Sequence, residues 1–238
     1  MLEYVNLPKL CHVGDFAVWR DVAGWLARMH QLGKGVRNLL PERPAGCFAQ
    51  KVPDPFPELA PLLVCDETLY RFWMDRALAN ITAAAARGKV SRRRQFQRLA
   101  DRYESVVQRL SALAVTFIHG EFYASNILVS ENGTSPRRIC PVDWELAAIG
   151  TGLLDLAALT AGSWSEGQRL ALVRAYYDAL AAEGNLTTSF EKLLEDLDYC
   201  RLHLAVQWLG WARNWTPPKD QAQDWLGEAL RVAGKLGL

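Results

Sequence analysis

Apolar residues recur along much of this chain at the three- and four-residue spacing of an amphipathic helix. In the segment 15–30 they fall on one side of such a helix, and Gly33 follows as a stop signal. The residues of this stripe are Phe16, Trp19, Val22, Leu26 and Met29. We therefore predict a helix over residues 15–30 that packs its apolar face against a core.

The same spacing predicts further helices. Asp66 is placed to cap a helix that runs to about residue 85, and residues 91–113 carry another regular apolar stripe. Two prolines at 217 and 218 reset the chain before a last helix. About six helices are expected in total.

Two pairs of polar residues have the spacing of capping boxes. Ser165 precedes Gln168 by three residues, and Thr188 precedes Glu191 by three. In such a box the hydroxyl and the longer side chain each bond a backbone N–H at the start of a helix. We therefore expect helices to begin at both places.

Three short apolar segments rich in β-branched residues interrupt the helices between Val115 and Asp155. They read TFI (116–118), NILV (126–129) and ICPVDW (139–144), and polar residues lie between them. This pattern is typical of short buried strands with chemistry at their ends. Together with the helices it predicts an α+β fold that is mainly α-helical.

The composition favours one globular domain. The chain has 238 residues, of which 50% are hydrophobic and 22% charged, so it can bury one sizeable core. Residues 40–63 carry six prolines and are expected to form an irregular surface connection rather than a helix. We therefore predict a single domain over residues 1–238.

Charge and cysteine content exclude several classes of protein. A net charge of +1 argues against general nucleic-acid binding, which needs clustered excess Lys and Arg. No apolar run has the length of a membrane span. The five cysteines lack the regular spacing of a disulfide framework. A cytoplasmic protein without nucleic-acid or membrane partners is therefore expected.

Three polar residues within 115–155 have a distinctive spacing. Glu121 lies five residues before Asn126, and Asp143 follows seventeen residues later. Protein kinases space their catalytic-loop acid, their metal-binding Asn and their metal-binding acid in this way. The spacing indicates phosphoryl-transfer chemistry.

These residues lie in motifs that resemble a known family. The segment HGEFYASN (119–126) is similar to the HGDxxxxN box of the aminoglycoside phosphotransferase and choline kinase family. The segment VDWE (142–145) resembles the family's second metal motif, and GLLDLA (152–157) its G-x-x-x-D-L-A segment. The resemblance covers the chain as the C-terminal lobe of a protein-kinase-like fold.

The resemblance implies an ATP-dependent reaction that uses Mg²⁺. By position, Asn126 and Asp143 correspond to the metal ligands, and Glu121 to the acid that takes the proton of the acceptor hydroxyl. His119 is expected to orient the catalytic loop through hydrogen bonds. Glu121 departs from the family's usual Asp by one methylene, which moves the carboxylate by about 1.5 Å.

The same resemblance implies a place for the nucleotide base. Leu128 and Val142 correspond to an apolar floor beneath adenine. Residues 1–8 resemble the hinge between the two lobes, where Glu3 and Val5 would offer backbone groups to adenine. A frayed N-terminal strand is the alternative for this segment.

No N-terminal lobe with a phosphate loop and a nucleotide-binding Lys can be placed in this sequence. A separate segment that supplies such a lobe is therefore an expected partner. Three functions remain open: a phosphotransferase that acts on a hydroxyl of a small molecule, a C-lobe that binds nucleotide, metal or a small molecule without turnover, and a helical interaction protein.

The family's acceptors include aminosugars, choline-like alcohols and amino-acid hydroxyls, so the resemblance does not select one. Four acids on the long helix that starts near residue 190 could attract a cationic acceptor. They are Glu191, Glu195, Asp196 and Asp198. The alternative is that they form a solvated face.

Overall fold

The computed structural model describes residues 5–35, 62–88, 91–130, 136–182, 184, 188–211 and 223–238. Its chain divides into two compact units. The first comprises residues 1–40 and 114–194, and the second comprises residues 41–113 and 195–238. Most of the predicted connection at 40–63 lies outside the described residues, although Leu63 begins a short strand.

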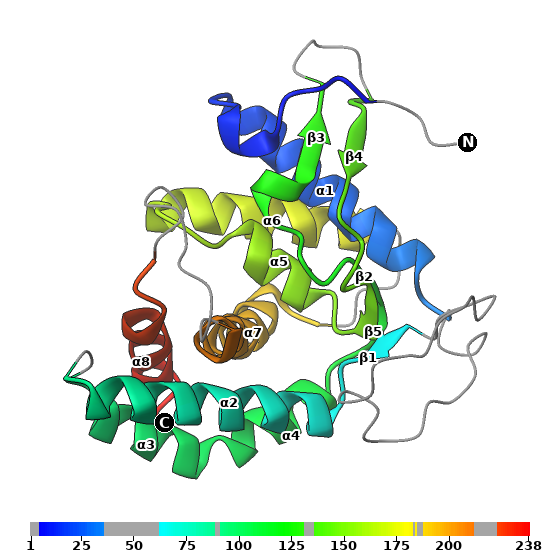
Figure 1. Ribbon diagram of the computed structural model, residues 1–238. Coiled ribbons are helices and arrows are strands. Elements are labelled where there is room, and N and C mark those ends of the chain that lie inside the picture. Colours follow the sequence, from blue (N-terminus) through cyan, green and yellow to red (C-terminus); the bar gives the residue numbers. More distant parts are fainter. Residues whose placement is uncertain are drawn as a thin grey trace, which may run out of the picture. The chain divides into compact units, whose positions relative to one another are not determined.

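The first unit combines helices with all the strands of the predicted 115–155 region (Figure 1). Its helices are α1 (Phe16–Leu32), α5 (Leu153–Leu159), α6 (Glu166–Ala182) and the short turns η1 (Leu10–His12) and η4 (Ala124–Asn126). Its strands are β2 (Thr116–Ile118), β3 (Ile127–Val129), β4 (Ile139–Pro141) and β5 (Ala148–Gly150).

Side-chain caps mark the starts of α1 and α6, of which the one at α6 was predicted. The Asp15 carboxylate accepts a hydrogen bond of 2.9 Å from Ala17 N at the start of α1. At α6, Ser165 N donates to Gln168 Oε1 at 3.1 Å and Gln168 N donates to Ser165 Oγ at 3.2 Å. This reciprocal pair is the predicted capping box. The two helices pack along each other.

The strands form two short antiparallel pairs. In the β2–β5 pair Phe117 lies opposite Ile149, and in the β3–β4 pair Leu128 lies opposite Cys140. The three predicted strand segments are confirmed. β5 was not predicted, because its AIG sequence is short and shows no alternation of polar and apolar residues.

Apolar side chains from α1, the strands and α5 make one core within the first unit. Its fully buried members include Val22, Leu26, Ile118, Phe122, Ile127, Val129, Leu156 and Leu159. Burial of each such side chain contributes about 1.5–3 kcal/mol. The polar box at 119–126 is thus held between two strands that are anchored in this core.

The second unit is mainly helical. It contains β1 (Leu63–Val64), α2 (Glu67–Ala86), α3 (Arg93–Arg102), α4 (Glu104–Ser111) and α8 (Trp225–Lys235). It also contains most of α7 (Phe190–Trp211). The predicted cap of α2 is confirmed, because the Asp66 carboxylate accepts a hydrogen bond of 2.9 Å from Leu69 N.

The helix predicted over 91–113 is interrupted. It forms as α3 and α4, which meet at Tyr103, where the backbone bonds shift to a three-residue spacing (Tyr103 N to Ala100 O, 3.2 Å). The buried Tyr103 hydroxyl lies 2.7 Å from His203 Nδ1. The predicted apolar stripe is confirmed, since all five of its members are buried: Phe96, Leu99, Tyr103, Val106 and Leu110.

The predicted start and acidic face of α7 need correction. Ser189 caps the helix instead of Thr188, because its hydroxyl accepts a hydrogen bond of 3.2 Å from Lys192 N. Asp196 and Asp198 are buried rather than solvated. Asp196 pairs with Arg109, and Asp198 with Arg201 and Lys235. These two acids therefore hold the second unit together and are not a free anionic face.

The buried His203 makes the second unit sensitive to acid. Burial lowers the pKa of His203 from 6.5 to about 3. The unfolded chain therefore binds a proton that the folded chain rejects between these values, so stability is lost as the pH falls through this window. We expect this group to contribute a slope of about 1.4 kcal/mol per pH unit to the free energy of unfolding.

The measurement is urea unfolding from pH 7 to pH 4. The double variant Tyr103→Phe, His203→Leu removes both hydrogen-bonding groups, and its slope should be shallower than that of the wild type. His12 is exposed, so His12→Leu is the matched control and should keep the wild-type slope. An unchanged slope in the double variant would contradict this assignment.

Among the described residues, no helix is both long enough and apolar enough to cross a membrane.

Candidate active site

The predicted box lies on the segment that links β2 to β3, and Gly120 shapes its first turn. The backbone of Gly120 has a φ of +85°, which disfavours side chains. A Cβ at this position would also lie 2.1 Å from the carbonyl oxygen of Leu146. Glycine is therefore required here for two separate reasons.

Gly120→Ala should consequently destabilise the protein more than a glycine-to-alanine substitution at a position that has the positive φ but no close neighbour. Gly162 has a φ of +104°, and no atom lies within 4 Å of where its Cβ would stand, so Gly162→Ala isolates the backbone cost of about 1–2 kcal/mol. We expect thermal unfolding to show a clearly larger loss for Gly120→Ala. Equal losses would show that the Leu146 carbonyl moves without cost.

The buried carboxylate of Asp155 holds the start of the box in place. Asp155 is 1% exposed and lies in the first turn of α5. Its Oδ2 accepts a hydrogen bond of 2.7 Å from His119 N, and its Oδ1 accepts one of 2.9 Å from Gly120 N. Charge-assisted bonds of this kind are stronger than neutral ones, so the carboxylate fixes the backbone that precedes Glu121.

His30, at the end of α1, supports Asp155 from the other side. Its Nε2 lies 3.2 Å from Asp155 Oδ2, and its Nδ1 lies 2.9 Å from the Tyr176 hydroxyl. Since a carboxylate only accepts, Nε2 carries the proton of this bond. A Cβ on Gly152 would lie 2.5 Å from His30 Nδ1, so this glycine leaves room for the ring.

The sequence interpretation did not identify His30. A signal was available, because His30 stands four residues after Leu26 on the apolar face of the predicted helix. A polar ring on such a face needs a buried partner.

The ring of His119 joins the box to the second motif. Glu121 N donates to His119 Nδ1 at 3.2 Å, and His119 Nε2 lies 3.0 Å from the carbonyl oxygen of Val142. Because Nδ1 accepts, the proton must lie on Nε2, which donates to Val142. Burial lowers the pKa of His119, which favours this neutral ring. The ring thus sets Glu121 relative to the residue before Asp143.

Asn126 is oriented by the same segment. Its Nδ2 donates a hydrogen bond of 3.1 Å to the backbone carbonyl oxygen of Glu121. The backbone carbonyl oxygen of Asn126 accepts one of 2.9 Å from Val142 N. Because the amide nitrogen must face a carbonyl, Oδ1 is turned away from it and can act as a ligand. The backbone of Asn126 therefore lies beside the second motif, and its Oδ1 accepts a long hydrogen bond of 3.5 Å from Ser125 Oγ.

Asp143 follows β4 in a strained conformation. Among the described residues, Asp143 is the one non-glycine residue with a positive φ (67°). Its side chain is exposed. Backbone strain of this kind often marks a functional position. Burial, followed by the charges of Asp143 and Glu145, raises the pKa of Glu121. Asp143 and Glu145 therefore lie close enough to Glu121 for their charges to act on it.

The donor set can be compared with what a metal requires. Among the described residues, no group of three or more His, Cys, Asp and Glu side chains could hold a metal ion. Mg²⁺ usually needs only one or two protein oxygens, because water and substrate phosphates complete its shell. The amide oxygen of Asn126 and the carboxylate of Asp143 fit that smaller set, and the mutual repulsion of the nearby acids favours a cation.

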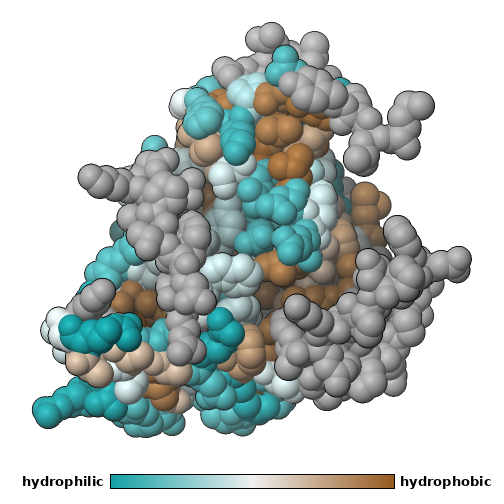
Figure 2. All heavy atoms as spheres, viewed as in Figure 1, coloured by the Kyte–Doolittle hydropathy of each residue, from teal (hydrophilic) through white to brown (hydrophobic). Residues whose placement is uncertain are grey.

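The residues expected beneath adenine share one face of the β3–β4 hairpin. Leu128 lies opposite Cys140, and Val142 continues the strand two residues later, so the alternation of side chains puts both on the same side. Leu128 is half-buried and Val142 is 38% exposed. Figure 2 shows apolar residues beside polar ones on the face of this unit that carries the hairpin.

The hinge-like segment runs beside this hairpin. Val129 N donates a hydrogen bond of 3.0 Å to the carbonyl oxygen of Pro8, and Lys9 forms a bridge with Leu128. Val5 is half-buried, whereas Glu3 lies outside the described residues. The segment that contains Val5 therefore approaches the strand that carries Leu128.

The fold is similar to those of several solved kinases. A choline kinase from Cryptosporidium parvum Iowa II superposes with a TM-score of 0.53 at 11% identity, over 99% of this chain and 69% of that one. A Plasmodium vivax ethanolamine kinase superposes with a TM-score of 0.55 at 12% identity, over 99% of this chain and 64% of that one. The GDP complex of wild-type aminoglycoside 2'-phosphotransferase-IIIa superposes with a TM-score of 0.53 at 13% identity, over 95% of this chain and 64% of that one.

The chain thus spans about two thirds of the length of these structures. At these identities the likeness concerns the fold, and it confirms the predicted α+β, mainly helical, protein-kinase-like class. No curated protein sequence matches the chain.

A sequence comparison defines the family. The model of the phosphotransferase enzyme family matches residues 9–189, which is most of the chain and includes all three predicted motifs. The hydrogen bonds of Asp155 and His119 connect these motifs within the matched region. The chain therefore belongs to the phosphotransferase enzyme family.

Proposed function

We propose that this chain transfers the γ-phosphate of ATP to a hydroxyl group of a small molecule. The observation that carries the proposal is the joining of the box to the second motif: His119 and Asn126 both bond the backbone of Val142, next to Asp143. Phosphoryl transfer needs little covalent chemistry from the protein, but it needs this kind of fixed arrangement of acid and ligands.

In the proposed reaction each residue of the site has one task. The Glu121 carboxylate faces the acceptor hydroxyl and takes its proton while the new O–P bond forms and the bond to the β-phosphate oxygen breaks. Asn126 Oδ1 and an Asp143 carboxylate oxygen would hold Mg²⁺, which would supply positive charge to compensate the phosphate oxygens. His119 is a positioning residue, because its ring bonds only protein groups.

The raised pKa of Glu121 suits the role of a base. A carboxylate with a pKa nearer to neutral binds the transferred proton more strongly than an ordinary one. The same repulsion from Asp143 and Glu145 that raises this pKa is relieved when a cation binds between them.

The nucleotide is proposed to lie on the face formed by Leu128 and Val142, with the segment that contains Glu3 and Val5 along its edge. The GDP complex among the solved structures of similar fold supports a nucleotide donor. A separate segment that supplies an N-lobe remains part of the proposal. The cytoplasm, expected from the irregular spacing of the cysteines, is the proposed location.

Calorimetric titration of ATP in the presence and absence of MgCl₂ tests the site. We expect binding that depends on Mg²⁺ and is lost in Asp143→Asn. ATP binding without turnover would favour a binding C-lobe. A folded chain that binds no ATP would favour the helical interaction protein and contradict the proposal.

A further inference from the structure

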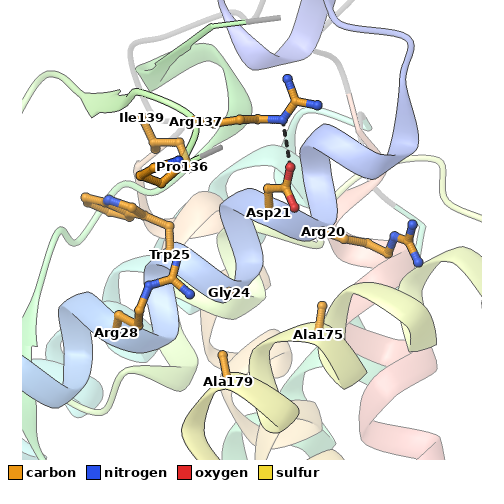
Figure 3. A pocket seen from close by; sticks show the side chains of 10 residues that line it. All are labelled: Arg20, Asp21, Gly24, Trp25, Arg28, Pro136, Arg137, Ile139, Ala175 and Ala179. Atoms are coloured by element: carbon orange, nitrogen blue, oxygen red, sulfur yellow. Dashed lines mark hydrogen bonds and ion pairs between the residues drawn. The ribbon is translucent and has the colours of Figure 1, made fainter. Parts of the chain in front are cut away.

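A cavity lies in the first unit and is lined by residues that take no part in the site described above. It has a volume of about 680 Å³ and lies between α1, α6 and the segment 136–139 before and within β4 (Figure 3). This volume falls in the range of pockets for small organic ligands, about 300–1,000 Å³.

Small residues create the space. Gly24 on α1 and Ala175 and Ala179 on α6 line the region where the two helices face each other. Figure 3 shows both alanine side chains directed from α6 toward α1. Larger residues at these positions would fill the cavity.

Three arginines line this space, and Figure 3 shows the guanidinium groups of Arg20 and Arg28 at opposite ends of it. Arg20, Gly24 and Arg28 are four residues apart and therefore share one face of α1. Arg28 folds back over the glycine, because its Nη1 lies 3.6 Å from where a Cβ of Gly24 would stand. Arg137 adds the third guanidinium group from the other wall.

One carboxylate offsets part of this charge. Arg137 Nε lies 2.7 Å from Asp21 Oδ2, as the dashed line in Figure 3 shows. Within the described part of the chain, neither Arg20 nor Arg28 has such an ion pair. Three arginines and one aspartate give the cavity a net charge of +2, which matches a dianion.

An aromatic ring completes the wall. Trp25 lines the cavity, and its ring stacks on that of Phe122 with an interplanar angle of 7° and a centroid distance of 6.1 Å. Because Phe122 is fully buried, the indole is held in place and offers a firm apolar surface. The ligand is therefore expected to carry an apolar or ring-shaped part next to its anionic group.

We propose that this cavity binds a phosphomonoester of a small organic molecule. The phosphate group carries a charge near −2 at neutral pH and accepts the paired N–H groups of Arg28, while Arg20 adds positive charge at the other end of the cavity. Arg137, held by Asp21, completes the basic wall, and the organic part packs against Trp25 and the alanines of α6. The site is separate from the proposed phosphotransfer site and does not depend on that function.

Calorimetric titration of the whole chain with phenyl phosphate, without nucleotide or metal, tests this proposal. Phenyl phosphate has both the dianion and the ring, benzoate is a monoanion and phenol is neutral. We expect a Kd for phenyl phosphate below about 1 mM, with benzoate and phenol at least about tenfold weaker.

Matched variants locate the binding. Arg28→Gln should weaken phenyl phosphate binding about tenfold, because it removes a charged hydrogen-bond donor, and Arg20→Gln should weaken it by a smaller factor, because it removes only a more distant charge. Ala175→Leu, which fills the cavity without changing charge, should weaken it as well. Arg93 is an exposed arginine of the second unit, and Arg93→Gln should leave binding unchanged.

Thermal unfolding verifies that each variant is folded. The proposal is overturned if phenyl phosphate does not bind at about 10 mM. It is also overturned if benzoate binds as well as phenyl phosphate, if Arg28→Gln keeps the wild-type affinity, or if Arg93→Gln loses as much affinity as Arg28→Gln does.

Discussion

Asp143→Asn is expected to lower the rate of phosphoryl transfer by at least about 10²-fold, since it removes the charged ligand of the proposed metal site. Asn tolerates positive φ, so the backbone at 67° should be retained and the loss should reflect the charge alone. Rates at saturating ATP over a range of MgCl₂ concentrations measure the effect. A variant with wild-type turnover at low MgCl₂ would remove Asp143 from this role.

The matched control is Asp143→Gly, which removes the backbone strain together with the carboxylate. It should be as inactive as Asp143→Asn but more stable than the wild type by about 1 kcal/mol. Opposite changes in activity and stability would show that the strain is maintained for function. If Asp143→Gly is less stable than the wild type, the positive φ carries no strain.

Glu121→Gln is expected to lower kcat by about 10²- to 10⁴-fold, the usual contribution of a general base. The protein should stay folded, because the amide has nearly the same shape and the carboxylate is already destabilised by its neighbours. Turnover with saturating substrates, with circular dichroism as the check on folding, is the measurement. Near-full turnover would exclude Glu121 as the base.

The same substitution should also change the free energy of unfolding, in a direction that depends on pH. A carboxyl group whose pKa is raised on folding contributes stability at low pH and loses it as the pH rises through the folded pKa. Without metal, Glu121→Gln should therefore be more stable than the wild type at pH 7, while the difference should vanish in acid. Glu121→Asp keeps the carboxylate but shortens the side chain by about 1.5 Å, so its turnover should lie between those of the wild type and Glu121→Gln.

The sequence was most informative where local chemistry determines local structure. The caps at Asp66 and Ser165 act on backbone groups within three residues, so their patterns predicted the starts of helices correctly. The strands β2, β3 and β4 could be predicted because β-branched residues stood in short runs, whereas β5 could not. The spacing of Glu121 and Asn126 follows from one segment of chain, so it too could be read from the sequence.

Other features depend on residues far apart in the chain. The contact between His30 and Asp155 joins residues 125 positions apart, and the break at Tyr103 accompanies a hydrogen bond to His203, 100 positions away. The pairing of Asp196 with Arg109 is of the same kind. No periodicity in one segment could reveal these partners.

Transfer of a radiolabelled γ-phosphate from ATP to a small hydroxylated acceptor is the decisive measurement of the proposed activity. The acceptors would be an aminosugar, a choline-like alcohol and a hydroxyl amino acid, each with MgCl₂ and with EDTA. We expect label in at least one acceptor with MgCl₂, none with EDTA, and a loss of at least about 10²-fold in Asp143→Asn. Transfer that is undiminished in Asp143→Asn, or a folded protein that binds ATP and labels none of the acceptors, would contradict the proposed activity.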